Sequence, residues 1–346
     1  METRTIKADR PEVVSAAIDR IHAPIGMGYI GKRFFPGLRV RDVASTLYHK
    51  TLDVDASAQT GRGATASFER AAITNGSKSY SALEKGKVYQ IPETDVKKYG
   101  SIEAADRIGV TAACRSVYRK HETDAAAKLI TTARYNDGTY LTNGQVLKGL
   151  QTVAISLGRY YGNTVLAGST TFFQNFVAST DVAAKISAMI GNGSIGLEDL
   201  KSSIASDPKL ACQLLRAFLP FDEVLVGEDT FWAPSGKTDV GIVARLPKME
   251  DVKNAEDFDM LMREVPVFGA TPWYYPDEDD IEFKARSFFD EDNDCNVYKA
   301  KGFYDLVELN AAAVKCVKLN VFATTTTSTT TTTAETTTTT TTTAGG

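Results

Sequence analysis

The sequence contains few cysteines and histidines, which are the usual ligands of zinc, and cysteine also forms the disulfides of small secreted proteins. Its four cysteines lie far apart with no Cys-x-x-Cys pair, and they are Cys114, Cys212, Cys295 and Cys316. This spacing argues against a zinc ribbon and against a disulfide scaffold, and it is typical of a reducing compartment. The three histidines share no metal-ligand spacing either, and they are His22, His49 and His121.

Long apolar runs are also missing, although 43% of the 346 residues are hydrophobic. No stretch of about 18 apolar residues occurs, so the sequence predicts no transmembrane helix. The first residues, METRTIKADRPEVV, are charged and lack the apolar core of a signal peptide, so we do not expect Sec export. A chain of this length can bury a sizeable core, and the length favours about two domains.

Motifs with a defined chemistry are absent or incomplete. Gly236-Lys237-Thr238 lacks the preceding glycine of a phosphate-binding P-loop, because Phe231 holds that position, and we expect an exposed turn there. His121 and Glu122 do not begin a His-Glu-x-x-His motif, since residue 125 is alanine, and nothing favours a Cys–His nucleophile. The sequence therefore predicts no catalytic, cofactor-binding or metal-ligating residue, and we expect a protein that is not an enzyme.

Two acidic clusters leave one alternative open. The run from Asp290 to Asp294 spaces its carboxylates as calcium loops do, but the sixth and twelfth positions are Cys295 and Lys301 instead of glycine and glutamate. A second run spans 277–280. We interpret both as solvated acidic loops, with an uncharacterised metal-binding protein or enzyme as the alternative.

Charge of the two signs is unevenly distributed along the chain. Residues 1–120 hold 20 Lys and Arg against 13 Asp and Glu, a net charge of +7, whereas the remainder is net −11. The whole-chain value of −4 alone predicts no affinity for nucleic acid. This asymmetry is either a functional feature of the first third of the chain or statistical drift along a long chain.

The pattern along the chain indicates an α+β protein with helices in the middle and strands at both ends. Residues 46–91 suggest two weak strands around a glycine-containing turn. We expect helices over 101–134 and 146–161, and further strands at 163–168, 221–227, 239–244, 267–275, 281–289, 296–300, 303–309 and 314–322. Residues 324–346 include 17 threonines, and we expect 323–346 to be a disordered tail that is dispensable for folding.

The order of these segments resembles the major capsid protein of tailed bacteriophages, with the Hong Kong 97-type fold. The resemblance covers roughly residues 35–322. The resemblance rests on the order of a basic arm, a long glycine-containing loop and an alanine-rich helix. It rests above all on the segments FDEVLVGE, VFGATPWYYPDEDD and NVYKAKGFYDLVELNAAAVKCVKLN.

The resemblance implies a division of the chain that the residue pattern alone does not give. It implies an N-terminal arm (1–45), an extended loop (46–91), a peripheral domain with a long spine helix (92–161 and 303–322) and an axial domain (162–302). It also implies self-assembly into the pentamers and hexamers of an icosahedral shell around double-stranded DNA. Opposite charges on neighbouring subunits and basic residues facing the DNA fit this function.

The same resemblance implies the partners and the location. Further partners are a portal, a scaffolding or decoration protein where one is used, and packaged DNA held by non-specific electrostatics, with no membrane. The protein would be made in the host cytoplasm and located in the virion. An encapsulin-like compartment, whose shell shares the fold but holds an enzyme as cargo, is the alternative within this resemblance.

Overall fold

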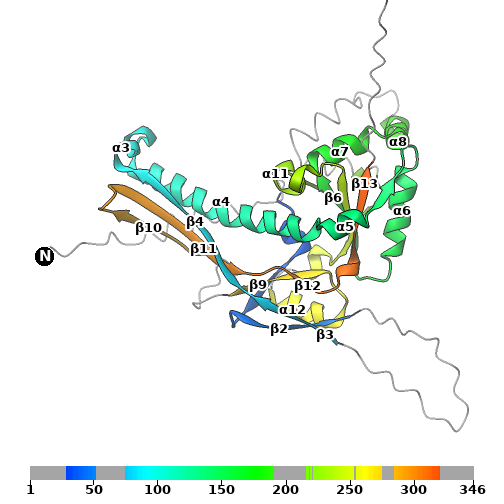
Figure 1. Cartoon of the computed structure of the whole chain (residues 1–346), viewed down its shortest axis with the longest axis horizontal. Coiled ribbons are helices and arrows are strands. Elements are labelled where there is room, and N and C mark those ends of the chain that lie inside the picture. Colours follow the sequence, from blue (N-terminus) through cyan, green and yellow to red (C-terminus); the bar gives the residue numbers. More distant parts are fainter. Residues whose placement is uncertain are drawn as a thin grey trace, which may run out of the picture.

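A compact lobe carries a long projection in the computed structural model of this chain (Figure 1). The structure describes residues 29–51, 75–190, 216–217, 219, 221–252, 255–274 and 284–319. Several predicted features lie outside the described residues: the first 28 residues, the middle of the expected loop, the acidic run 277–280 and the threonine-rich tail. None of the helices in the described ranges is both long and apolar enough to cross a membrane.

The projection consists of one long helix on a three-stranded antiparallel ribbon. Strand β11 (Cys295–Tyr304) lies between β10 (Lys284–Asp290) and β4 (Leu83–Pro92). Helix α4 (Ile102–Leu129) runs along this ribbon for about 42 Å, at 1.5 Å per residue (Figure 1). Its composition favours helix, because alanine has the highest helix propensity. Its first turn is capped by Ser101, whose hydroxyl accepts a hydrogen bond from Ala104 N at 3.1 Å.

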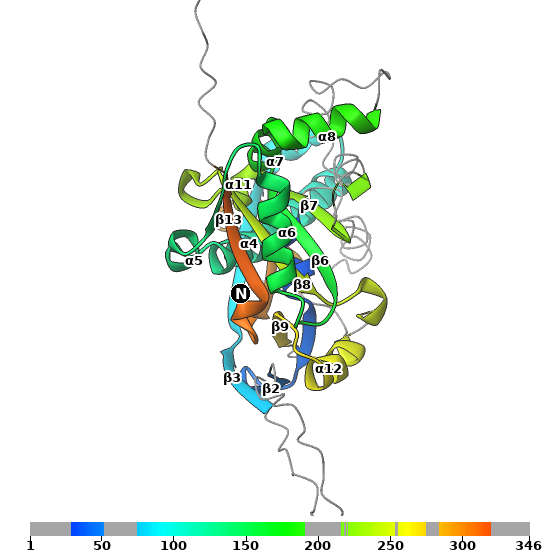
Figure 2. The same ribbon diagram turned by 90° about the vertical axis from the view of Figure 1, so that its right-hand side faces the viewer.

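The lobe is built on a five-stranded mixed sheet with both faces buried. Its strand order is β5 (Thr139–Leu141), β13 (Val314–Leu319), β8 (Val240–Leu246), β6 (Asn163–Ser169) and β7 (Glu223–Gly227). Alternate residues face two separate cores, one shared with α4 and one formed with the lobe's own helices. Figure 2 shows α6 in front of this sheet. The lobe's larger helices are α6 (Val146–Ser156), α7 (Thr170–Val177) and α8 (Thr180–Ile190).

A third group of elements lies below the junction of lobe and projection in the view of Figure 1. Strand β1 (Gly37–Val40) pairs in parallel with β9 (Gly269–Tyr274), which also pairs with β12 (Val307–Glu308) and the end of β11. A hairpin of β2 (Ala44–Lys50) and β3 (Asn75–Ser81) packs with α12 (Ala255–Glu264) around its own small core. The remaining short elements are α2 (Gly31–Phe34), α3 (Glu93–Val96), η2 (Lys97–Tyr99), α5 (Thr132–Asn136), α11 (Asp229–Trp232), η3 (Pro234–Gly236), η4 (Met249–Asp251) and η5 (Ala311–Ala313).

The sheets group the chain differently from the expected division. Strand β13, which we assigned with 92–161, lies inside the lobe's sheet beside β8, whereas β10 and β11, which we assigned to the other domain, form the ribbon under α4. Residues 29–40 are also packed into the core of their own chain, with Phe34 and Phe35 fully buried. The arm, loop, peripheral and axial names stay predictions.

Candidate functional site

The two faces of the ribbon have different environments. Tyr298 and Ala300 of β11 are fully buried on the face that packs on α4. On the opposite face, the register places Phe288 and Gln90 on either side of Val297, and Val88 beside Lys299. Val88 is 47% exposed and Phe288 42% exposed. Apolar side chains that remain exposed close together on a sheet face can form part of a surface that contacts another protein.

A glycine in α4 allows the helix to lie directly on the ribbon. Gly109 faces the ring of Tyr298, and a Cβ atom at this position would overlap that ring. The phenol of Tyr298 donates a hydrogen bond of 2.7 Å to Asp106, one turn before Gly109 on the helix. The ribbon is thus held to the first half of α4 by close backbone approach and by a buried polar contact.

A carboxylate near the other end of α4 binds two strands of the ribbon. Asp124 accepts hydrogen bonds from Lys85 of β4 at 2.6 Å, from Lys120 at 2.8 Å and from the phenol of Tyr304 of β11 at 3.3 Å. Lys85 also lies over the ring of Tyr304 at 4.3 Å. Partial burial opposes ionisation of Asp124, but the two ammonium groups hold its pKa below the usual value. The helix and the ribbon are therefore also joined at this end of the projection.

A second carboxylate, Glu122, joins the projection to the lobe. Its side chain is buried and accepts hydrogen bonds from Ile30 N at 2.6 Å, Gly31 N at 2.8 Å and the indole Nε1 of Trp232 at 2.6 Å. Burial raises the pKa of Glu122 to about 7, although the three N–H donors favour the ionised form. Segments that are far apart in the sequence thus meet at one side chain.

Two arginine–carboxylate pairs connect the same junction. Arg33 of α2 binds Glu223 of the lobe through Nε at 2.8 Å and a terminal nitrogen at 2.7 Å. Arg134 of α5 binds Glu308 of β12 in the same two-pronged way, at 2.8 and 2.7 Å. Such bidentate pairs fix orientation as well as distance. They hold the α2 segment and the strand leading to β13 in place at the base of the projection.

His121 lies in the same junction and is fully buried. Its Nε2 is 3.2 Å from the hydroxyl of Thr271, which itself donates to Phe35 O at 2.7 Å. The imidazole also stacks on Trp273 at 5.9 Å between ring centres. Because the Thr271 hydroxyl donates its proton to Phe35, it accepts from Nε2–H of the neutral imidazole. Burial, assisted by Lys32, lowers the pKa of His121 to about 3.

This burial predicts a specific dependence of stability on pH. The pKa of His121 is lower in the folded than in the unfolded protein. Its contribution to the free energy of unfolding is therefore fully present above about pH 6.5 and is lost as the pH falls towards 3. Below pH 6 the free energy of unfolding should fall by about 1.4 kcal/mol per pH unit more in the native protein than in His121→Gln. Urea unfolding at pH 7, 6 and 5 measures both slopes. Equal slopes would contradict a buried neutral imidazole.

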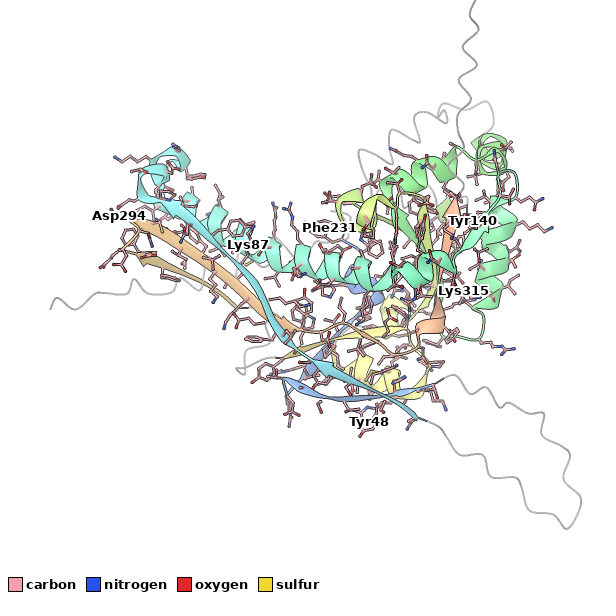
Figure 3. The ribbon with its side chains drawn as sticks, in the orientation of Figure 1. Tyr48, Lys87, Tyr140, Phe231, Asp294 and Lys315 are labelled. Carbon is pink, nitrogen blue, oxygen red and sulfur yellow. The ribbon has the colours of Figure 1, made fainter. Side chains whose placement is uncertain are left out.

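The motifs weighed in the sequence occupy surface turns. Pro234–Gly236 forms a short 3-10 turn before β8, with Ser235 and Gly236 at positive φ, as expected for an exposed turn. The run from Asp290 forms the tip of the projection, where Figure 3 labels Asp294, and Asp290 accepts from Asp292 N and from the Asn293 amide. Within the described ranges no three His, Cys, Asp or Glu side chains are grouped to hold a metal ion.

The buried polar groups at the junction were not predicted from the sequence. Glu122 stands in an alanine-rich helix, where a glutamate is usually exposed, and its donors are 91 to 110 residues away along the chain. The cysteines 114, 295 and 316 are buried and free. Nothing in the local pattern distinguishes Asp106, Glu122 and Asp124 from surface acids, because their partners come from other segments.

No family model matches this sequence, and no curated protein matches it either. Among solved structures, a phage-related protein from Bordetella bronchiseptica matches 92% of this chain and 98% of its own, with a TM-score of 0.57 and 14% identity. A virus-like particle from Pyrococcus furiosus matches 89% and 99% (TM-score 0.49, 8% identity). The mature capsid of bacteriophage PhiM1 matches 84% and 86% (TM-score 0.45, 11% identity).

The similarity to the Bordetella structure extends over nearly the whole of both chains, so it includes the projection as well as the lobe. The predicted fold class is confirmed: the chain has an α+β fold of the Hong Kong 97 type. The long helix on its ribbon and the mixed sheet of the lobe are the two parts of this fold.

Proposed function

We propose that this chain is the major capsid protein of a tailed bacteriophage, a non-enzymatic subunit whose copies assemble into an icosahedral shell around double-stranded DNA. The fold supports this proposal, because the sequence resemblance to capsid proteins of tailed bacteriophages implied a fold of this type. The match along the full length of a phage-related protein supports it as well.

The observation that carries the proposal is the open face of the ribbon. The projection is held rigidly by Gly109, Asp106 and Asp124, yet it leaves Val88 and Phe288 exposed on the side away from α4. A thin two-layer projection of this length buries little surface of its own. Repeated contacts between copies would cover the remaining apolar surface, and a closed shell provides such contacts for every subunit.

Particle formation by the purified chain tests the proposal. Gradient sedimentation and negative-stain electron microscopy of the full chain, expressed alone and with the proteins encoded beside it, should show closed shells of uniform size. A chain that stays monomeric under all of these conditions would contradict the proposal.

The ribbon face provides a sharper prediction. Val88→Asp combined with Phe288→Asp should reduce the particle yield at least tenfold, because two desolvated carboxylates would oppose contact between copies. The control is Val88→Thr, which keeps the β-branched shape and adds a single hydroxyl. Circular dichroism should show that all variants fold. Normal particles from the double aspartate variant would exclude the ribbon face as a contact.

The content of the particles separates the two kinds of shell. Nuclease-resistant DNA in particles from infected cells is expected, together with a portal and, where one is used, a scaffolding or decoration protein. An enzyme as cargo in place of DNA would instead indicate an encapsulin-like compartment. The proposal places the protein in the virion after synthesis in the host cytoplasm, with no membrane involved.

A further inference from the structure

Charges on the long helix α4 are separated by sign between its inner and outer sides. Three of its four acids are used inside the molecule: Asp106 on Tyr298, Glu122 on the backbone and Trp232, and Asp124 on Lys85, Lys120 and Tyr304. The fourth acid, Glu103, is exposed in the first turn. The basic residues are all exposed, and they are Arg107, Arg115, Arg119, Lys120 and Lys128. The solvent side of α4 is therefore strongly positive, although the helix as a whole is nearly neutral.

Three of these bases form a row. Arg115 and Arg119 are one turn apart on the side of α4 away from the ribbon, and Arg107 lies about two turns before Arg115 and about 80° around the helix axis from it, so the three span about 18 Å along the helix. Within the described ranges Arg107 and Arg115 form no ion pair. Arg119 donates to the phenol of Tyr29 at 3.3 Å and lies in the field of Glu228.

We propose that this row, Arg107, Arg115 and Arg119, binds the phosphate backbone of duplex DNA without reading its sequence. The inference rests on the proposed function, and it names the face of the subunit that contacts the packaged DNA. A duplex presents about one negative charge per 1.7 Å of its axis, or about ten along the length of this row. Guanidinium groups suit this partner because they bind phosphate oxygens in a planar, bidentate manner.

A protein partner fits this row less well. The centres of protein interfaces are rich in apolar and aromatic side chains, and the arginines that occur there stand among such side chains. Between residues 107 and 119 the large exposed apolar side chain is Ile108, at 48% exposure, and an arginine lies before it and others after it. The ribbon face on the other side of the projection differs, because it exposes Val88 and Phe288 and its Lys299 and Lys301 are paired with Glu84.

The test compares two pairs of charge-removing substitutions in the full chain. Arg107→Gln with Arg115→Gln changes the row and spares Arg119, which contacts Tyr29. The control, Lys148→Gln with Lys315→Gln, removes the same charge from exposed positions on the lobe. Binding of a labelled 24-base-pair duplex of random sequence is followed by fluorescence anisotropy between 50 and 200 mM salt.

We expect the arginine pair to reduce the slope of log affinity against log salt by about 1.8, or about 0.9 for each lost phosphate contact. The control pair should leave the slope within about 0.3 of the native protein. Equal effects of both pairs, no effect of the arginine pair, or no DNA binding by the native chain at 50 mM salt would each overturn the inference.

Particle formation is measured on the same variants, so that the two proposals fail separately. Normal particles from the arginine pair, with a reduced salt slope, would support both. Loss of particles with unchanged DNA binding would show that the row contacts another copy of the chain, and this would overturn the inference. Absence of particles from the native chain would contradict the proposed function, whatever the DNA measurement gives.

Discussion

Replacing Glu122 by alanine should destabilise the protein by about 4 kcal/mol. The substitution leaves the backbone N–H groups of Ile30 and Gly31 and the indole N–H of Trp232 without their buried acceptor, and each unsatisfied donor costs roughly 1–3 kcal/mol. For a chain of this size we expect Tm to fall by about 6 °C. Urea unfolding followed by tryptophan fluorescence measures the effect directly, since Trp232 is itself one of the partners.

Two further variants make this prediction specific. Glu122→Gln keeps the size of the side chain, but it offers one oxygen to three donors and turns its own NH2 group towards them, so it should also destabilise, by about 2 kcal/mol. Glu103→Ala, at an exposed position of the same helix, should change stability by less than about 1 kcal/mol. If Glu122→Ala costs no more than Glu103→Ala, Glu122 does not hold the junction together.

The second large effect is expected at Gly109. Alanine favours helix over glycine by about 1 kcal/mol, so Gly109→Ala would stabilise an isolated α4. In the folded protein the new methyl group would overlap the ring of Tyr298, and we expect a net loss of about 3 kcal/mol. The exposed face of the ribbon would shift with the ring, so the particle yield should fall as well.

A double-mutant cycle locates the cause of this loss. In a Tyr298→Leu background the ring is gone, and Gly109→Ala should cost at least 1.5 kcal/mol less than in the native background. Thr111→Ala, at a half-buried position two residues further along α4, serves as the control and should stabilise by a few tenths of a kcal/mol. Additive effects of the two substitutions would exclude contact between Gly109 and Tyr298 as the reason.

Periodicity predicted the elements well because it is a local property. The helix expected from residue 101 is α4, and its cap at Ser101 is visible in the sequence as a polar residue before an alanine-rich stretch. Strand β6 has nearly every residue buried, and it was recognised as a short apolar run. Helix α12 was not predicted, although its buried residues Phe258 and Met262 are spaced by four.

The arrangement of the elements could not be predicted in the same way. Strands β11 and β13 are close in the sequence and both are mostly buried, yet one joins the ribbon and the other the lobe. The pattern of buried and exposed residues shows which residues of a strand share a face, but it does not identify the strands that pair with it. Only the resemblance to a known family supplied the overall fold, and the division into domains that it implies stays a prediction.

The positions of β11 and β13 also determine when the subunit becomes complete. Each pairs with at least one strand made much earlier: β11 with β4, and β13 with β5 and β8. Synthesis proceeds at about 5–20 residues per second, so the ribbon is complete only when residue 304 has left the ribosome, and the lobe's sheet only when residue 319 has. Until then a growing chain has no finished ribbon with which to recruit other copies. The order of the strands thus delays association through the ribbon until translation has passed residue 304.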